Sequence, residues 1–222
     1  MQKNYSKTMA GVFVLILCDI GNTTFHFFIN GEHKKYFLDE ELPRLDESIY
    51  YISVNETATE KFKASFTHII NLKEYINFNT NYVGMGIDRI VACIGYNNTV
   101  IIDAGSAVCV DIMENNEHIG GFILPGIKNY EKIYAQISPK LDFDFSVKVN
   151  LDKIPLHTKD AISYSILKAI ILPIKEIVQS KKVIFTGGDG ELLSKYFNNS
   201  EYKQDLIFEN MKGIIDANNC IT

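Results

Sequence analysis

The sequence predicts an α/β fold that is built twice from the same order of elements. The main observation is a motif found in each half, in which an apolar run ends in an aspartate, a glycine turn follows, and a second apolar stretch leaves the turn. The first copy covers residues 14–29 around Asp19, and the second covers residues 100–112 around Asp103. A third extended stretch follows each copy, after which helical and extended apolar periods alternate. We therefore expect two domains of the same topology.

The first predicted domain is residues 1–97, of which residues 1–9 are polar and aperiodic and are expected to form a flexible extension. Asn30-Gly31 predicts a hairpin because both residues tolerate positive φ. Asn55 is a favourable N-cap for a helix. The elements expected after the first strand are strands at residues 25–29, 35–38, 50–54 and 68–72, an acidic helical stretch before residue 50, and a helix ending at residue 66.

The second predicted domain is residues 98–222, and it repeats the order of the first. Its long helix contains Pro173, which we expect to kink or divide it, because proline lacks an N–H and clashes with the preceding turn. The expected elements are strands at residues 99–103, 108–112, 118–124 and 183–185, a helix at 127–137, a polar loop at 140–156, the long helix from 159, and helices around Leu192 and Met211.

Composition excludes several classes of protein. The 222 residues are 46% hydrophobic and 22% charged, with a formal net charge of −5, so we expect a globular protein with no nucleic acid as partner. The apolar run over residues 10–18 is too short to cross a membrane and ends at Asp19, so we expect a buried strand and no membrane contact. The four cysteines are isolated and the five histidines dispersed, which favours a reducing cytoplasm and disfavours a zinc site.

A strand that delivers an aspartate into a glycine turn suits a polyphosphate. Glycine lets backbone N–H groups approach closely, hydroxyl and amide side chains donate hydrogen bonds, and the aspartate orients a hydrated Mg²⁺. One such turn is also typical of an ordinary hairpin. Two turns in equivalent positions indicate a nucleotide-dependent phosphotransferase that grips ATP from both sides.

Three further segments are candidates for chemistry. Residues 84–89 open an apolar helix, in which Asp88 is a candidate base for a hydroxyl proton and Arg89 a candidate clamp for an anionic group. Their structural alternatives are a favourable charge at a helix start and an ordinary ion pair. Residues 120–126 and 186–188 are glycine-rich, and each suits either a plain turn or a loop against a bound ligand, the second beneath an adenosine.

Together these segments resemble the type III pantothenate kinases, a family of the superfamily that includes acetate and sugar kinases, actin and the heat-shock ATPases. The shared motifs are D-x-G-N-T at Asp19, G-x-D-R at Gly86, D-x-G-[TS]-A at Asp103, G-G-x-I-x-P-G at Gly120 and T-G-G at Thr186. The resemblance implies a duplicated ribonuclease-H-like (actin-like) fold with an interdomain ATP cleft. It also implies phosphorylation of pantothenate to 4'-phosphopantothenate, the first step of coenzyme A biosynthesis, by a homodimer that uses ATP, Mg²⁺ and a monovalent cation, K⁺ or NH₄⁺.

The resemblance also implies roles for individual residues. Asp88 is the expected proton acceptor, Asp103 the expected ligand of the monovalent cation, and Asp19 the residue that orients Mg²⁺ through water. Ser106 replaces the commoner threonine and retains its hydroxyl, whereas Ser165 stands where a glycine is expected. The expected ATP-binding residues are Asp19, Ile20, Gly21, Asn22, Thr23, Thr24, Ser106, Gly187 and Gly188. The expected pantothenate-binding residues are Tyr82, Gly86, Ile87, Arg89 and Thr158.

Two alternatives to a pantothenate kinase stay open. One is another small-molecule kinase of the same fold, such as a sugar kinase, which a panel of acceptor substrates distinguishes. The other is a non-catalytic regulatory relative, which predicts nucleotide binding without turnover.

Overall fold

The computed structural model describes residues 6–7 and 13–218, which form two compact units. Unit 1 is Met1–Phe78, Gly84–Ile94 and Asp205–Thr222, and unit 2 is Asn79–Val83 and Gly95–Gln204. Of the expected extension over residues 1–9, the described part is β1 (Ser6–Lys7), which pairs with β2 (Phe13–Val14); the remainder lies outside the described residues.

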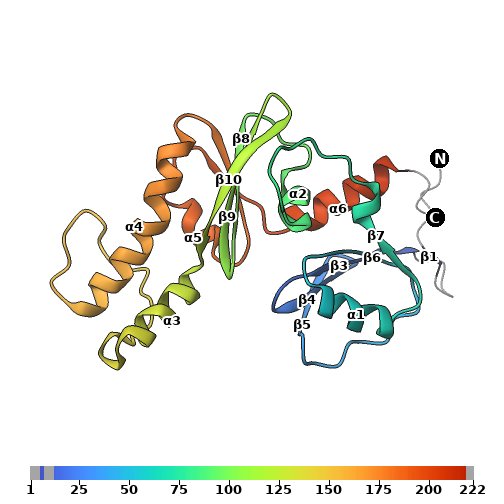
Figure 1. Ribbon diagram of the computed structural model, residues 1–222, viewed down its shortest axis with the longest axis horizontal. Coiled ribbons are helices and arrows are strands. Elements are labelled where there is room, and N and C mark those ends of the chain that lie inside the picture. The colour runs from blue at the N-terminus through green and yellow to red at the C-terminus, as the bar shows by residue number, and fades with distance from the viewer. Residues whose placement is uncertain (1–5, 8–12, 219–222) are drawn as a thin grey trace. The chain divides into compact units, whose positions relative to one another are not determined.

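The main sheet of unit 1 has the strand order β5-β4-β3-β6-β7 (Figure 1). Its central strand is antiparallel to β4 and parallel to β6. At the β4–β5 hairpin, Asn30 and Gly31 have φ of 51° and 92°, as the sequence predicts. The strands are β3 (Ile16–Ile20), β4 (Thr24–Ile29), β5 (Glu32–Phe37), β6 (Ile49–Ser53) and β7 (Ile69–Asn71), the last followed by the 3₁₀ turn Leu72–Tyr75.

Helix α1 (Glu56–Ser65) contributes to the hydrophobic core of unit 1. Asn55 caps it through a 2.9 Å hydrogen bond from the Ala58 N–H, as predicted. Phe62 is fully buried among aromatic rings of the sheet, a burial worth about 2–3 kcal/mol. Helices α2 (Ile87–Cys93) and α6 (Leu206–Ala217) pack against each other in the same unit.

The sheet of unit 2 has the strand order β10-β9-β8-β11-β12. By order along the chain this is third, second, first, fourth and fifth, which is also the order in unit 1. The predicted duplication of an α/β topology is therefore confirmed. The strands are β8 (Thr99–Ala104), β9 (Ala107–Glu114), β10 (Glu117–Pro125), β11 (Lys182–Thr186) and β12 (Ser200–Tyr202).

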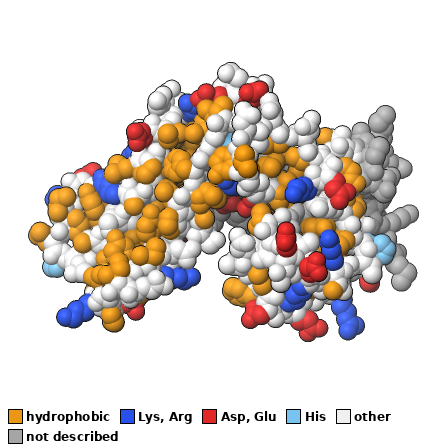
Figure 2. Space-filling model, in the orientation of Figure 1, with side chains coloured by type: hydrophobic (Ala, Val, Ile, Leu, Met, Phe, Trp, Pro, Cys, Tyr) orange, Lys and Arg blue, Asp and Glu red, His pale blue; other side chains and the backbone are white. Residues whose placement is uncertain are grey.

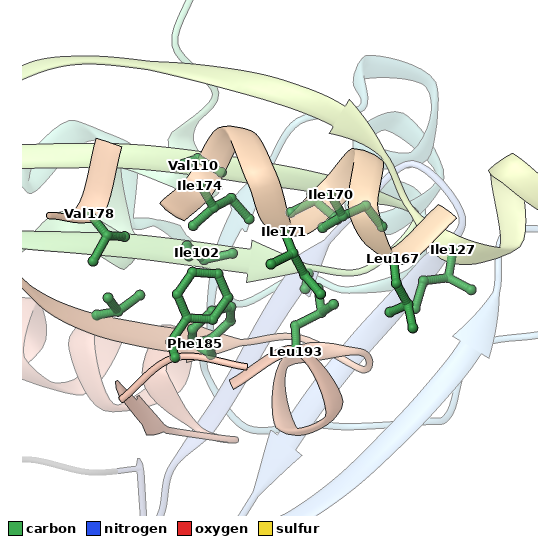
Figure 3. Packing of buried hydrophobic residues seen from close by; sticks show 14 of the residues in the cluster. Ile102, Val110, Ile127, Leu167, Ile170, Ile171, Ile174, Val178, Phe185 and Leu193 are labelled. Atoms are coloured by element: carbon green, nitrogen blue, oxygen red, sulfur yellow. The ribbon is translucent and has the colours of Figure 1, made fainter. Parts of the chain in front are cut away.

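The core of unit 2 joins this sheet to three helices, α3 (Ile127–Ile137), α4 (Thr158–Val178) and α5 (Gly190–Ser194). A short 3₁₀ turn, Pro139–Leu141, follows α3. Figure 3 shows residues of α4 lying over Ile102, Val110 and Phe185 of the sheet; these residues are Leu167, Ile170, Ile171, Ile174 and Val178. Among the described helices, none is both long and apolar enough to cross a membrane.

The structure differs from the sequence expectations at two places. The acidic stretch before β6 is not helical, because Pro43 interrupts it and disfavours helical φ and ψ at the preceding residue. Lys61 instead donates to the carbonyls of Leu38 and Glu40, which holds the loop against α1. Pro173 does not divide α4, which runs unbroken through it. The buried neighbours Ile170 and Ile174 hold both sides of the proline in one core.

Candidate functional site

The first aspartate–glycine turn joins β3 to β4 in unit 1. The Gly21 N–H donates to the Thr24 carbonyl at 3.0 Å, which closes the turn, and Asn22 and Thr23 are exposed. Asp19 is half-buried and pairs across the sheet with His26. The turn thus presents a carboxylate, an amide and hydroxyls at the end of the central strand.

The start of α2 lies in the same unit, beside a pocket of about 440 Å³. A Cβ at Gly86 would meet the Asp88 carboxylate, so a larger residue there requires the Asp88 side chain to move. The Asp88 carboxylate accepts a 2.8 Å hydrogen bond from the Arg89 N–H, and the Arg89 side chain is buried. The pocket is lined by Ser53, Val54, Asn55, Glu56, Thr59, Glu60, Lys63, Lys73, Met85, Gly86, Ile87 and Ile90.

The second aspartate–glycine turn, in unit 2, joins β8 to β9. The Gly105 N–H donates to the Ala107 carbonyl at 2.8 Å, and Ser106 is exposed. The start of α3 braces this turn, because the Gly126 N–H and the Asn129 side-chain amide both donate to the Ser106 carbonyl, at 3.0 and 2.7 Å. A side chain at Gly126 would collide with the turn backbone.

The Thr186-Gly187-Gly188 segment packs against the residues that lead into the same turn. Thr186 stands beside Asp103 on neighbouring parallel strands, so both motifs end at the same edge of the sheet. Gly187 has a φ of 82°, and a Cβ there would fall on the Asp103 carboxylate and the Ala104 carbonyl. This backbone approach leaves a carboxylate and a carbonyl oxygen side by side.

A half-buried acidic group follows the glycine pair. Burial raises the pKa of the Asp189 carboxyl above its ordinary value; the nearby Lys128 opposes this shift and Glu131 adds to it. Lys128 and Glu131 form an ion pair at 3.1 Å on α3. Asp189 is the N-cap residue of α5, but its side chain makes no cap hydrogen bond to this helix.

The remaining predicted residues lie elsewhere in unit 2. Tyr82 is half-buried, and its ring meets the His118 ring edge-on at 5.9 Å. Thr158 is exposed in the first turn of α4. The hydroxyl of Ser165, where a glycine is expected, bonds to Tyr134 at 2.8 Å.

Two histidine chains were not anticipated from the sequence, where the histidines look dispersed. In unit 1, His26 bonds to His33 and His33 to Asp205, each at 2.9 Å. In unit 2, a buried chain links Asp111, His118 and Thr80. The available signal was an aspartate inside the apolar run of β9, because a buried carboxylate requires a partner.

The residues at the second turn fit a monovalent cation. The half-buried carboxylate of Asp103, beside Gly187, is the donor type that hard cations prefer. No group of three or more His, Cys, Asp or Glu side chains suited to a metal occurs among the described residues. Asp19 offers a single carboxylate, which suits Mg²⁺ that retains waters and phosphate ligands.

Comparisons with known proteins extend these observations. A family model described as type III pantothenate kinase matches residues 48–180. A Campylobacter jejuni protein named type III pantothenate kinase is 46% identical over 205 residues, covering 92% of this chain and 98% of that protein. Proteins of the same name from Helicobacter hepaticus and Helicobacter pylori are 44% and 36% identical, covering 91% and 89% of this chain and 98% and 89% of those proteins.

Solved structures agree on the fold. A conserved Campylobacter jejuni protein, described as belonging to a Baf family of transcriptional activators, superposes with a TM-score of 0.81 at 45% identity, covering 92% of this chain and 98% of that one. A structure from Sinorhizobium meliloti, described as a 2-dehydro-3-deoxygalactonokinase, gives a TM-score of 0.59 at 9% identity, covering 91% of this chain and 96% of that one. The second similarity shows the fold alone.

Proposed function

The chain belongs to the type III pantothenate kinase family, and we propose that it transfers the γ-phosphoryl group of ATP to the primary hydroxyl of pantothenate. The bond from the hydroxyl oxygen to the γ-phosphorus forms as the bond to the bridging oxygen of ADP breaks. The products are 4'-phosphopantothenate and ADP, and the reaction is the first step of coenzyme A biosynthesis.

The observation that carries this proposal is the start of α2. Gly86 and Ile87 line the pocket, and Asp88 follows them directly in the chain with its carboxylate beside Gly86. A volume of about 440 Å³ lies within the range of pockets that bind small molecules. A base adjoining a pocket of this size is what transfer to a small alcohol requires.

The proposed roles are those that the resemblance to the family implies. Asp88 orients the acceptor hydroxyl and takes its proton late, which suffices because phosphoryl transfer has a loose transition state. Arg89 holds the carboxylate of pantothenate, and Tyr82 and Thr158 contact the same substrate. The turn over residues 19–24, Ser106 and the glycines Gly187 and Gly188 bind ATP through hydroxyl and backbone N–H groups.

Two cations complete the proposal. Asp103 would hold a monovalent cation, K⁺ or NH₄⁺, and Asp19 would hold the waters of Mg²⁺. Bound there, the cations supply positive charge that offsets the negative charge of the phosphates.

We further propose a homodimer in the cytoplasm. Unit 2 exposes large apolar side chains on and after α3, where Figure 2 shows hydrophobic side chains gathered. Exposed apolar patches of this kind mark association surfaces. These side chains are Ile133, Ile137, Phe143, Val147, Ile154 and Leu156. Sedimentation velocity tests the proposal, and a monomer at micromolar concentration contradicts it.

The first experiment measures ADP release from ATP and Mg²⁺, with and without pantothenate, in K⁺, NH₄⁺ or Na⁺. We expect turnover that requires pantothenate and is faster in K⁺ or NH₄⁺ than in Na⁺. Asp88→Asn is expected to lower kcat by about 10² to 10⁴-fold while ATP still binds, since that is the contribution of a positioned base. Near-normal turnover of this variant would remove Asp88 from the proposed role.

The same assay tests the regulatory alternative, which the description of the Campylobacter jejuni structure favours. A regulator predicts saturable ATP binding but no ADP release with pantothenate or with any sugar in an acceptor panel. Release with a sugar and not with pantothenate favours the other kinase.

A further inference from the structure

A buried polar chain anchors the segment that carries Tyr82. Asp111 on β9 and His118 on β10 are 2% and 3% exposed, and the His118 Nε2 lies 2.8 Å from an Asp111 oxygen. The other ring nitrogen, Nδ1, lies 2.7 Å from the Thr80 hydroxyl. Both nitrogens of His118 therefore have partners, one in the sheet and one in the segment Asn79–Val83.

The partners assign the direction of these hydrogen bonds. An ionised Asp111 only accepts, so Nε2 of His118 carries the proton that it receives. In the neutral ring, Nδ1 then accepts from the Thr80 hydroxyl. The Thr80 oxygen in turn accepts from the Tyr82 N–H at 3.0 Å. An unbroken series of hydrogen bonds thus connects the backbone of Tyr82 to a carboxylate inside unit 2.

Other contacts hold the same segment to the same hairpin. The His118 N–H donates to the Asn79 carbonyl at 3.2 Å, and the Asn79 amide donates to Glu117 at 2.8 Å. Beyond Tyr82, Val83 is 94% exposed and Gly84 has a φ of 78°. Asn79 and Thr80 therefore anchor the segment shortly before the residues that open α2.

Burial of a carboxylate and an imidazole is costly unless both are well paired, and apolar side chains of similar volume fill a core at least as favourably. Filling the core therefore does not by itself account for this chain. The series of hydrogen bonds reaches the Thr80 hydroxyl, which also accepts the hydrogen bond from the Tyr82 N–H. The arrangement suits a device that holds one short segment in one place.

We propose that Thr80, His118 and Asp111 are positioning residues that fix Tyr82 for the acceptor substrate. The inference rests on the proposed function, in which Tyr82 contacts pantothenate. Loss of the chain loosens the acceptor site and leaves the turns that bind ATP as they are. The effect is therefore selective between the two substrates.

The test is Thr80→Val, which retains the shape of the side chain and removes the hydroxyl. We expect the KM for pantothenate to rise about tenfold, the factor that corresponds to one ordinary hydrogen bond, while the KM for ATP changes less than twofold. Pantothenate should also raise the Tm of this variant less than that of the unmodified protein, whereas ATP should raise both equally. Thr80→Ser restores the hydroxyl and is expected to restore both readouts.

Thr67→Val is the matched control. The Thr67 hydroxyl also bonds to a histidine Nδ1, that of His68, at 3.1 Å, but this pair is exposed in unit 1. Its kinetic constants should equal those of the unmodified protein.

The outcomes separate two kinds of failure. Three outcomes overturn the inference alone. They are an unchanged KM for pantothenate in Thr80→Val, an equal change in KM for both substrates, and failure of Thr80→Ser to restore the KM for pantothenate. Absence of pantothenate-dependent turnover in the unmodified protein overturns the proposed function and this inference together.

Discussion

The two aspartate–glycine turns share one backbone plan. In each unit the aspartate stands near the end of the central strand, and the carbonyl of the next residue accepts a hydrogen bond from the loop after the neighbouring parallel strand. In unit 1 the Val54 N–H donates to Ile20 at 3.1 Å, and in unit 2 the Asp189 N–H donates to Ala104 at 2.9 Å. The duplication has preserved both the strand order and this hydrogen bond.

The turns differ in how closely other backbone encloses them. Gly126 and Gly187 press against the turn of unit 2 so tightly that neither position has space for a Cβ. At the turn of unit 1, a Cβ on Gly21 would meet only the Thr24 carbonyl, at an ordinary 3.7 Å. Glycine therefore occurs at the two turns for different reasons. Packing within the protein requires Gly126 and Gly187 in unit 2, whereas Gly21 leaves space beside an exposed turn.

The largest expected effect is that of Gly187→Ala. The substitution combines a φ of 82° with a collision against Asp103 and Ala104, so we expect a loss of about 3 kcal/mol in the free energy of unfolding. Urea denaturation measures it. Gly188→Ala is the matched control for stability, because a Cβ on the adjacent glycine meets nothing within 4 Å. Equal losses in the two variants would contradict the steric argument.

Gly126→Ala is expected to have the second largest effect. Its Cβ would meet the carbonyls of Gly105 and Ser106, both backbone atoms that shift only if the turn moves, so we expect a loss of about 2 kcal/mol. The matched substitution Gly105→Ala, within the turn itself, meets nothing within 4 Å and should retain stability. Thermal unfolding distinguishes them, and a Tm of Gly126→Ala equal to that of Gly105→Ala would refute the difference.

Local sequence patterns predict most of this fold. The apolar runs predict most strands of both sheets. Short local motifs predict where elements begin or turn, such as Asn30-Gly31 at a hairpin and Asn55 at a helix start. The strand β12 escapes prediction because Ser-Glu-Tyr has no apolar pattern; its position depends on backbone pairing with β11. A local pattern does not carry the identity of a partner strand.

The site is less predictable than the fold for the same reason. The motifs identify Asp19, Asp88 and Asp103 as candidates, but they do not show which other segments of the chain pack around these residues. The contact of Thr80 with His118 spans 38 residues, and no spacing rule connects the two. Such contacts depend on how the segment Asn79–Val83 joins unit 2, which is a property of tertiary packing.

A smaller effect is expected from acid on unit 1. His26 lies opposite Asp19 in the sheet. Its pKa is lowered to about 3, mainly by burial and further by the positive charges of Lys35 and His33. The unfolded chain therefore binds more protons than the native state between about pH 3 and 6.5, so stability falls as the pH falls through this range. After a discount for the partly exposed ring, we expect a loss of about 1 kcal/mol between pH 7 and pH 5.

His26→Gln should show less of this loss, because the variant lacks the titrating ring. Urea denaturation at pH 7 and pH 5 measures the difference within each protein, so a constant destabilisation by the substitution cancels. His157→Gln, which removes an exposed histidine of unit 2, should retain the full acid loss. If His26→Gln loses as much free energy of unfolding between pH 7 and pH 5 as His157→Gln and the unmodified protein, the acid loss does not come from His26.

The smallest expected effect on stability is that of Gly21→Ala, at about 0.5 kcal/mol, since its φ is not left-handed and its Cβ has space. If glycine at this turn serves the close approach of a phosphate, the KM for ATP should rise while the Tm stays nearly constant. In Gly187→Ala, by contrast, stability and activity should fall together. A loss of stability in Gly21→Ala as large as that in Gly187→Ala would show that packing requires glycine at both turns. The two turns would then share their steric reason as well as their backbone plan.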